Sequence, residues 1–359
     1  MNKICGTGLE ESPHGDTLNY LMCNLETNQL SRFRARMIER LLRSRCLEKF
    51  RLFGRYYLIV FDATCIHVFK ERHCQHCLRR KDSCGKYYYY HCVVEAKLVC
   101  KNGMLLSLGT EFVENEHSDV DKQDCELRAA YRLMEKLKKD FPRLPICFLG
   151  DSLYANQTVF RYCERYNWQW IINFKPGSIP NVHKEFLSLL PVAPENRLIC
   201  NDQRFLWIDD IDHEGHKINL LACAEPDPKK PEGIRNFTWA TSFNINPYNV
   251  TALANEGGRL RWKIENEGFN TQKNEGFGLE HLYGEYYNAM KNYYLLMQSA
   301  HIIYQLIEFG WYSKIQLDDN FGSIKNLVRN ILHSLLYELI VWDEMEARSM
   351  QVRFLLDSS

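Results

Sequence analysis

The sequence lacks a long hydrophobic run, a signal peptide at its start and an excess of charge of either sign. Its 359 residues carry 45 basic and 45 acidic side chains, so no overall positive field attracts nucleic acid. The longest uncharged apolar stretch, residues 292–307, falls short of the roughly 20 residues that a membrane span requires. Fourteen cysteines without a signal peptide indicate a reducing compartment. We therefore expect a cytoplasmic protein with no membrane role.

The composition is that of a globular chain whose contacts with nucleic acid, if it makes any, are local. Apolar residues make up 45% of the chain and aromatic residues 13%, which is enough for a sizeable core. A DNA contact would come from short basic runs, although each run could equally be a solvated face. Three such runs stand out, at Arg79–Lys81, Lys136–Lys139 and Lys229–Lys230.

Hydrophobic patterning predicts an α/β fold. Residues 57–62, 91–100 and 104–114 read as three strands, and Asn102-Gly103 marks a hairpin turn between the last two. The next expected elements are a helix over 125–139, a strand over 146–149, a helix over 155–166 and a strand over 168–174. Three meandering strands followed by helix, strand, helix and strand are the order of a ribonuclease H-like mixed sheet flanked by helices.

The pattern outside these elements divides the chain into five segments. Many prolines and the sequence RFLWIDDIDHEGHKINLLACAE, which predicts two strands around a turn at Glu214-Gly215, indicate a β-rich insertion. From Val250 onward the pattern is mostly helical. The expected segments are 1–56, a lead-in with a basic amphipathic helix over 31–50; 57–174, the first part of the core, with a Cys/His insertion at 65–92; 175–236, the β-rich insertion; 237–310, the second part of the core, with the helix that carries Glu265; and 311–359, a C-terminal helical segment that includes a helix over 323–353.

Three acidic residues lie where two-metal chemistry on a phosphodiester would need them. Asp62 ends the apolar run YYLIVFD and Asp151 ends ICFLGD, so each carboxylate should emerge at the end of a buried strand. Glu265 comes from a predicted helix. Carboxylates brought together by folding can hold two divalent ions about 4 Å apart, and hard oxygen ligands favour Mg²⁺ or Mn²⁺.

Each acid also has an ordinary structural interpretation. Asp151 could cap the helix that follows it, and Glu265 could be only the ion-pair partner of Arg261 on the same helix face. Other acids compete for the third position, namely Glu95, Glu256 and Glu267. The strand order and the position of the insertion favour the trio over these alternatives.

Residues 57–285 resemble a DDE transposase of the bacterial insertion-sequence-four type. The likeness rests on the motifs DSLYA (Asp151–Ala155) and RWKIE (Arg261–Glu265), on the strand order and on the insertion before the Glu helix. The resemblance implies cleavage of DNA strands by water and strand transfer by the freed 3′-hydroxyl. It implies double-stranded DNA as the partner, at the element ends and the target, and a possible homodimer on that DNA. The catalytic, metal-binding trio would be Asp62, Asp151 and Glu265.

The family's signature around the third acid is only partly present. It contains a Tyr, an Arg, the Glu and a Lys; Gly258 stands at the Tyr position and Gln272 at the Lys position. Lys273 comes one residue late and would lie about 80° round the helix from the Glu. The DNA-contacting roles that the resemblance implies would therefore fall to Arg261 and to either Lys273 or Gln272.

A cysteine and histidine cluster lies between the first two predicted strands. Cys74 and Cys77 have the two-residue gap with which two thiolates reach one tetrahedral zinc ion. Cys84 with His91 or Cys92 could complete four ligands, while reduced cysteines in a loop are the alternative. The sequence therefore predicts a possible structural Zn²⁺ site. The basic residues around it could meet a DNA backbone with or without zinc, and the four tyrosines before His91 are interpreted as strand entry.

Two other functions are compatible with the sequence. A nuclease of the same fold would cut DNA without strand transfer. A truncated or inactive transposase would bind DNA without catalysis; the lead-in over 1–56 is short for the helical DNA-binding domain that family members carry, and the signature Tyr is absent.

Overall fold

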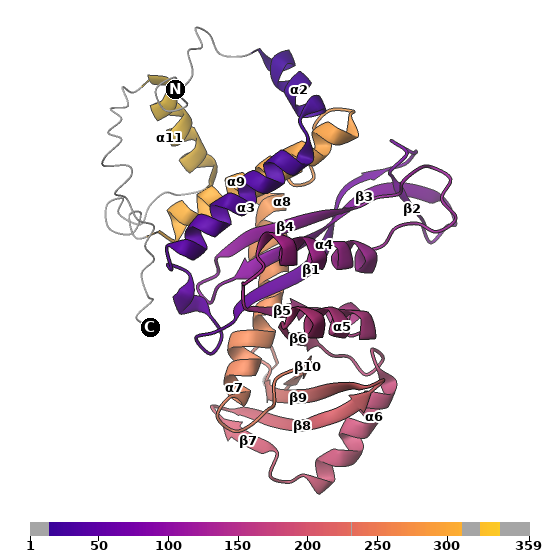
Figure 1. Cartoon of the computed structure of the whole chain (residues 1–359), viewed down its shortest axis with the longest axis vertical. Helices are drawn as coiled ribbons and strands as arrows, with labels where there is room; N and C mark the ends of the chain where they lie inside the picture. The colour runs from indigo at the N-terminus through magenta and orange to yellow at the C-terminus, as the bar shows by residue number, and fades with distance from the viewer. Residues whose placement is uncertain (1–13, 231, 311–323, 338–359) are drawn as a thin grey trace. The chain divides into compact units, whose positions relative to one another are not determined.

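The computed structural model describes residues 14–230, 232–310 and 324–337, and its chain divides into two compact units (Figure 1). One unit, which we call the sheet unit, spans Glu48–Glu265; the other, the helical unit, combines Met1–Leu47 with Asn266–Ser359. All three carboxylates of the expected trio fall in the sheet unit.

The sheet unit is built on one mixed sheet of ten strands. The strands follow the order β2-β3-β1-β5-β6-β10-β9-β8-β7, and β4 pairs with β3 outside this path. The strand bounds are β1 Tyr57–Phe69, β2 Leu78–Lys81, β3 Tyr87–Val99, β4 Leu105–Val113, β5 Ile146–Gly150, β6 Gln169–Asn173, β7 Arg197–Cys200, β8 Gln203–His213, β9 His216–Pro226 and β10 Ile234–Thr241.

The centre of the sheet is parallel and buried. β5 pairs in parallel with β1 on one side and with β6 on the other. Parallel strands covered on both faces need continuous apolar runs. Here Ile59, Val60, Phe148 and Leu149 are all fully buried. This explains why YYLIVFD and ICFLGD show no alternation of polar residues.

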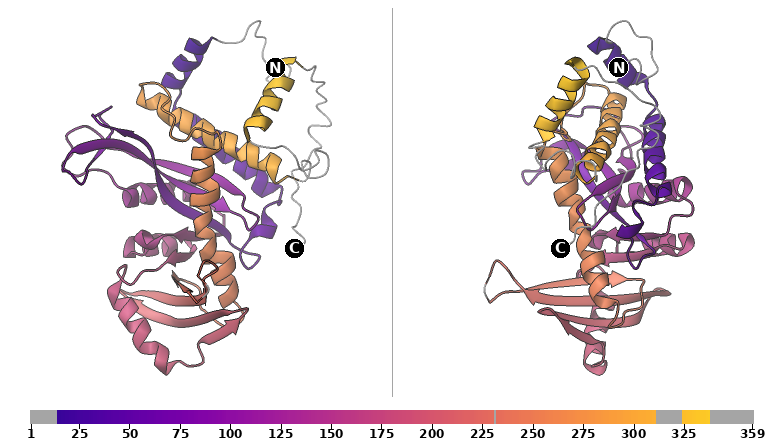
Figure 2. Two further views of the ribbon diagram at one scale, coloured as in Figure 1. Left: turned by 180° about the vertical axis from the view of Figure 1, so that it is seen from behind. Right: turned by 90° about the vertical axis from the view of Figure 1, so that its left-hand side faces the viewer.

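Helices cover both faces of this centre. α4 (Glu126–Asp140) and α5 (Gln157–Tyr166) lie on one face, and the helical segment that begins at α7 (Val250–Ala252) lies on the other (Figure 2). α4 can approach closely because Gly109 in β4 has no side chain. A Cβ on Gly109 would come within 2.7 Å of Leu133 on that helix.

The helical segment after α7 changes its hydrogen-bond pattern repeatedly. It continues as the π-helical η4 (Leu253–Gly257), the 3₁₀-helical η5 (Gly258–Trp262) and the π-helical η6 (Ile264–Asn270). Gly258, at the signature Tyr position, packs so tightly on the indole of Trp239 in β10 that an added Cβ would overlap it. The missing Tyr therefore has a physical reason in this chain, because Trp239 occupies the space.

The β-rich part of the sheet unit contains the strands expected around Glu214-Gly215. β8 and β9 form a hairpin there, and both turn residues have positive φ, 54° and 84°, as tight hairpin turns require. α6 (Pro180–Leu189) packs on β8 and leads through η3 (Leu190–Val192) toward β7. β10 then pairs with β9 on one side and β6 on the other, so this insertion extends the central sheet.

In the helical unit α9 (Tyr287–Glu308) packs on α2 (Gly15–Asn24) and α3 (Thr27–Arg43). The buried Asn292 of α9 donates hydrogen bonds from Nδ2 to the carbonyls of Met22 at 2.8 Å and Leu25 at 2.7 Å. The remaining helices are η1 Glu48–Phe50 and η2 Ser152–Tyr154 in the sheet unit, and α8 Thr271–Asn274 and α11 Ile324–Tyr337 in the helical unit. No helix in the described ranges is long and apolar enough to cross a membrane.

The predicted core elements are present, with one substantial error. β1 does not end at Asp62 but runs on to Phe69, because β3 pairs with it as far as Phe69↔Tyr89. The Cys/His segment over 65–92 is therefore largely strand rather than a loop. The helix expected over 31–50 begins earlier, as α3, and ends at Arg43. The helix expected over 323–353 lies partly outside the described residues, which include α11.

Gly258→Ala should destabilise the protein by about 1–3 kcal/mol, because overpacking a close contact costs this much. The matched control is Gly177→Ala, since nothing lies within 4 Å of a Cβ built there. Urea unfolding followed by tryptophan fluorescence measures both variants. Equal stability of the two would contradict the tight packing of Gly258 on Trp239.

Candidate functional site

Asp62 and Asp151 reach equivalent places on neighbouring parallel strands. The last parallel pair of β1 and β5 is Val60↔Leu149, and each Asp follows this pair by two residues. Asp62 still lies within β1, whereas Asp151 lies one residue past the end of β5, as the N-cap of η2. Both acids therefore follow the paired region of the two parallel strands.

Each Asp also bonds its local backbone. Asp151 Oδ1 accepts a hydrogen bond from the backbone N–H of Leu153 at 2.9 Å, so its expected capping role is confirmed for η2. Asp62 Oδ1 accepts from the N–H of Ala63 at 3.0 Å. A carboxylate has about four lone-pair sites, so neither bond is incompatible with metal binding.

Arg261 connects Asp62 to Glu265. Its Nη1 lies 3.5 Å from Asp62 Oδ2 and its Nη2 lies 2.7 Å from Glu265 Oε1, with only 5% of the Arg261 side chain exposed. One rigid guanidinium therefore holds both carboxylates through two of its nitrogens. The ion pair expected between Arg261 and Glu265 is confirmed, while metal binding by Glu265 stays a prediction.

Burial dominates the ionisation of Asp62. Desolvation raises the pKa of Asp62 from 3.8 to about 7; the charge of Arg261 opposes this rise, and the charges of Glu265 and Glu126 add to it. Carboxylates that share a poorly hydrated site are costly to ionise together. A divalent cation beside them would relieve that cost.

Glu126 is a fourth acid near this trio, and the sequence analysis did not single it out. It is the first residue of α4, and its Oε1 accepts a hydrogen bond from the Tyr154 hydroxyl at 2.8 Å. Burial raises the pKa of Glu126, the Tyr154 bond lowers it, and the charge of Asp151 raises it. In sequence, an acid in the first turn of a helix looks like an ordinary partner of the helix dipole.

The competing acids have partners of their own. Glu256 forms an ion pair with Lys101, and Glu267 belongs to the helical unit. Glu95 is fully buried and accepts hydrogen bonds from the hydroxyls of Ser107 and Thr110. It lies directly opposite Asp62 in the pairing of β1 with β3, so of the three competitors Glu95 is the one that strand pairing brings beside Asp62.

The acids do not yet surround one point closely enough to share an ion. In the described ranges, the group of at least three His, Cys, Asp or Glu ligand atoms found within 4.8 Å of one another, that of His73, Cys74 and His91, contains none of these acids. Arg261 accounts for the wider spacing of the acids, because its guanidinium lies between Asp62 and Glu265. For Asp62 and Glu265 to bind one metal ion together, the Arg261 guanidinium would have to move out from between them.

The other two residues expected to contact DNA lie in the helical unit. Gln272 is fully buried, where its Nε2 donates to Gln298 Oε1 and contacts His301 Nδ1, both at 2.9 Å. A buried amide with these partners cannot reach a phosphate, so the interpretation of Gln272 as a DNA-contacting residue is not supported. Lys273 pairs with Glu280 at 3.0 Å and keeps 32% of its side chain exposed; its DNA contact stays a prediction.

A second group of side chains, just before β2, could hold a metal ion. Cys74 Sγ and Cys77 Sγ lie 3.9 Å apart, and each lies 3.4 Å from His91 Nε2. On a tetrahedral zinc ion two sulfurs are about 3.8 Å apart, and a sulfur and a nitrogen are roughly 3.6 Å apart. The observed spacing is therefore that of ligands around one ion.

His73 is a candidate for a further ligand of this group. A ring nitrogen of His73 lies within 4.8 Å of the ligand atoms of Cys74 and His91. Its Nδ1 is buried without a hydrogen-bond partner, which is costly in a finished structure, and its ring stacks on Phe69 with centroids 4.5 Å apart. We call His73, Cys74, Cys77 and His91 the Cys/His cluster; its donor set is consistent with zinc.

Cys84 and Cys92 do not join the cluster, so this part of the predicted ligand set is wrong. β2 and β3 pair from Leu78↔Tyr90 to Lys81↔Tyr87, which puts Cys84 in the turn at the far end of the hairpin. Cys92 follows His91 and so faces the other side of the strand, where its Sγ lies 2.8 Å from Cys65 Sγ. The overlooked signal was the His directly before the first Cys of HCQHC.

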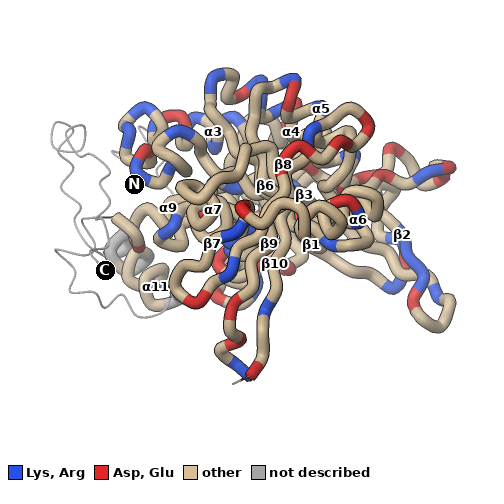
Figure 3. The backbone as a smooth tube through the Cα atoms, turned by 90° about the horizontal axis from the view of Figure 1, so that it is seen from below, with Lys and Arg blue, Asp and Glu red and all other residues tan. Residues whose placement is uncertain are grey.

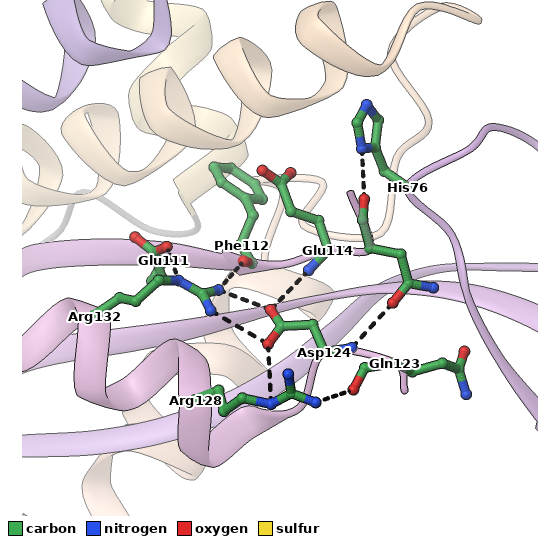
Figure 4. A network of polar contacts seen from close by, with 9 residues as sticks. His76, Glu111, Phe112, Glu114, Gln123, Asp124, Arg128 and Arg132 are labelled. Atoms are coloured by element: carbon green, nitrogen blue, oxygen red, sulfur yellow. Dashed lines mark hydrogen bonds and ion pairs between the residues drawn. The ribbon is translucent and has the colours of Figure 1, made fainter. Parts of the chain in front are cut away.

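The loop between β4 and α4 fixes the backbone that carries the cluster (Figure 4). Asn115 donates from Nδ2 to the Cys77 carbonyl at 2.9 Å, and its own carbonyl lies 2.8 Å from His76 Nδ1. The backbone N–H of Asp124 donates to Asn115 Oδ1 at 3.0 Å, and Arg132 Nη2 donates to the Asp124 carboxylate at 2.7 Å. Burial acts to raise the pKa of Asp124, but the hydrogen bonds and charge of Arg132 lower it below its usual value.

Comparison with models of known protein families and comparison with curated protein sequences each gave no match. The resemblance to a DDE transposase therefore depends on the motifs and on the geometry of the acids. What the protein does must be argued from these residues.

Protein purified without chelator should contain about one zinc ion per chain, because four ligands converge at the Cys/His cluster. Cys77→Ala and His91→Ala should lose the metal and lower the melting temperature. Cys84→Ala is the matched control within the same hairpin and should keep both. Elemental analysis and thermal unfolding measure these quantities; zinc retained by Cys77→Ala or lost by Cys84→Ala would refute the ligand set.

Asp62→Asn should stabilise the metal-free protein at about pH 8 by on the order of a few kcal/mol. Asp62 has a pKa of about 7 in the folded protein against an ordinary value of 3.8. Between these values the native state keeps a proton that the unfolded chain has released, so the wild type loses stability as the pH rises through this window. The neutral Asn avoids that loss.

Near pH 5 the wild-type carboxyl is already protonated in the folded protein, so the advantage of Asp62→Asn should largely disappear. Chemical unfolding in EDTA at the two pH values measures the difference. Asp212→Asn, at an exposed carboxylate of β8, is the control. An advantage of Asp62→Asn that does not change with pH would show that Asp62 ionises normally.

Proposed function

We propose that the sheet unit is a ribonuclease H-like domain and that the protein is a DDE transposase, which cleaves DNA strands and transfers them to a target. The chain order of three meandering strands, helix, strand, helix and strand, realised as β1, β3, β4, α4, β5, α5 and β6, supports the fold. The motifs DSLYA and RWKIE support the activity, since each contributes one acid of the proposed trio.

One observation carries the proposal. Asp62 and Asp151 each come two residues after the last pair of two parallel strands, and Glu265, over a hundred residues later in the chain, is held to Asp62 through Arg261. An Asp that only ends a strand, or a Glu that only stabilises a helix, would not need to lie near another acid of the trio. Convergence of three acids from two strands and one helix is what two-metal phosphoryl transfer requires.

In this proposal Asp62, Asp151 and Glu265 would hold two Mg²⁺ ions, which supply an activated attacking oxygen and a stabilised leaving oxygen. Water attacks the phosphorus, the bond to the 3′-oxygen breaks, and that oxygen leaves with a proton as the 3′-hydroxyl. In the second step this hydroxyl attacks a target phosphodiester. The chain contributes positioning and charge rather than a covalent nucleophile. Arg261 is a positioning residue that holds Asp62 and Glu265.

Zinc at the Cys/His cluster would have a structural role. Four protein ligands fill a tetrahedral shell and leave no open position for a water or a substrate. The cluster also lies in the outer part of the β1 and β3 strands, where the sequence offers exposed basic side chains rather than a large apolar core. The two metals thus have separate tasks in this proposal.

The non-catalytic alternative has one observation in its favour. Arg261 already neutralises Asp62 and Glu265, so the pair is electrostatically satisfied without a metal. A remnant that only binds DNA could keep this ion pair for stability alone. A nuclease without strand transfer would share the whole site and differ only in whether the cut 3′-hydroxyl is joined to another DNA.

The decisive experiment is nicking of supercoiled plasmid DNA by the full chain with Mg²⁺ or Mn²⁺. Glu265→Gln keeps the size and the Arg261 hydrogen bond but removes the charge that holds a cation, so it should lower the nicking rate by roughly 10²–10³-fold. Glu267→Gln, two residues away, should leave the rate within about twofold. Duplex binding and the melting temperature should stay close to wild type in both.

No nicking by the wild type would leave the DNA-binding remnant as the better account. Nicking that survives Glu265→Gln but not Glu267→Gln would show that the third acid is misassigned. Nicked product that is never joined to a second plasmid, even when a 3′-hydroxyl end is supplied, would favour the nuclease. Joined products would support the transposase.

A further inference from the structure

The outer parts of β1 and β3, together with β2, form an arm, which we define as residues 69–90. β2 is the edge strand of the sheet and pairs only with β3. Near the tip the arm is a two-stranded ribbon, because the pairing of β1 with β3 ends at Phe69↔Tyr89 whereas β2 continues to Lys81↔Tyr87. An antiparallel ribbon of this width fits the major groove of duplex DNA.

One face of the ribbon combines cations with tyrosines. Arg79 lies opposite Tyr89, and Lys81 lies opposite Tyr87, so all four side chains share a face. The Arg79 guanidinium lies 5.4 Å and the Lys81 ammonium 5.1 Å from the centre of the Tyr87 ring. Arg72 joins them, 5.0 Å from the Tyr89 ring centre. The tyrosine rings attract the cations and help to hold them in position, but they carry no negative charge that would neutralise them.

The arm carries uncompensated positive charge. Residues 70–86 contain six basic and two acidic side chains, and Figure 3 shows the run of Lys and Arg along β2. Within the ranges that the structure describes, none of these six cations pairs with a carboxylate; they are Lys70, Arg72, Arg79, Arg80, Lys81 and Lys86. Elsewhere in the unit even an exposed cation is paired, as Arg132 is with Asp124 at 2.7 Å. The chain has no net charge, so this local excess is unusual.

The arm is held in place where it leaves the sheet. Gln123 Oε1 accepts from the Arg79 N–H at 2.6 Å, and Gln123 Nε2 donates to the Arg79 carbonyl at 3.0 Å. The Cys/His cluster and the Asn115 bond to Cys77 fix the preceding residues. A fixed ribbon loses little conformational entropy when it binds.

We propose that the Arg72, Arg79 and Lys81 face of the arm binds the phosphate backbone of double-stranded DNA. Unpaired guanidinium and ammonium groups on a ribbon recognise phosphates without reading sequence. The choice of DNA as the polyanion rests on the proposed function. A charged edge strand can also serve merely to prevent pairing with other sheets, and the experiment separates the two.

The test measures binding of the full chain to a fluorescently labelled duplex of mixed sequence, by anisotropy without added Mg²⁺ or Mn²⁺, at salt concentrations from about 50 to 200 mM. Arg79→Ala combined with Lys81→Ala removes two phosphate contacts. The slope of log K against log salt should become shallower by about 1.8, and the affinity at the low-salt end should fall roughly tenfold or more. The matched control is Lys184→Ala with Arg197→Ala, which removes two exposed cations from α6 and β7 of the same unit and should change neither.

Equal effects of the two double variants would overturn the proposal, since they would report general charge rather than the arm. An unchanged slope for Arg79→Ala with Lys81→Ala would do the same and leave edge protection as the role of the charges. Tighter arm-dependent binding to duplex RNA, or to vesicles of anionic lipid, would also overturn it. Because no Mg²⁺ or Mn²⁺ is added, the outcome does not depend on catalysis, and plasmid nicking by the wild type tests the proposed function separately.

Discussion

The contact on which the candidate site depends is the one between Arg261 and its two carboxylates. β1 supplies Asp62 and the irregular helical segment supplies Glu265, and neither strand pairing nor helix hydrogen bonding would bring these acids together. A guanidinium has a fixed planar shape, so binding one acid through Nη1 and the other through Nη2 sets their separation. The tight packing of Gly258 on Trp239, three residues earlier, fixes where Arg261 begins.

The same contact leaves several acids beside a single cation, which makes it costly to ionise all of them. One buried cation faces Asp62 and Glu265, with Glu126 and Asp151 close enough to affect the ionisation of their neighbours. At Asp62 the effect of burial exceeds that of the Arg261 charge, and the pKa rises to about 7. A protein selected only for stability would have little reason to gather acids here, because ionising them is costly. Sites that keep such a cost are commonly functional.

Local patterns in the sequence could predict most of the core but not where its strands stop. Apolar runs identified β1 and β5, and Asn102-Gly103 identified the β3–β4 hairpin, because each is a property of adjacent residues. The extension of β1 past Asp62 depends on its partner β3, and polar residues such as His67 and Lys70 conceal it. The role of Glu126 and the burial of Gln272 depend on residues distant in sequence, so no spacing rule could find them.

The arm shows why metal ligands and basic side chains occur in one short segment. A ribbon that offers cations to a polyanion cannot also bury them, so it lacks the apolar face that stabilises most strands. The Cys/His cluster replaces that missing core at the point where the ribbon joins the sheet, and the Asn115 and Gln123 bonds add anchors to its backbone. The exposed tip can then consist of Arg, Lys and Tyr without losing its shape. In the arm, the stabilising contacts therefore lie at the base and the exposed charges at the tip, instead of on opposite faces of the same strand.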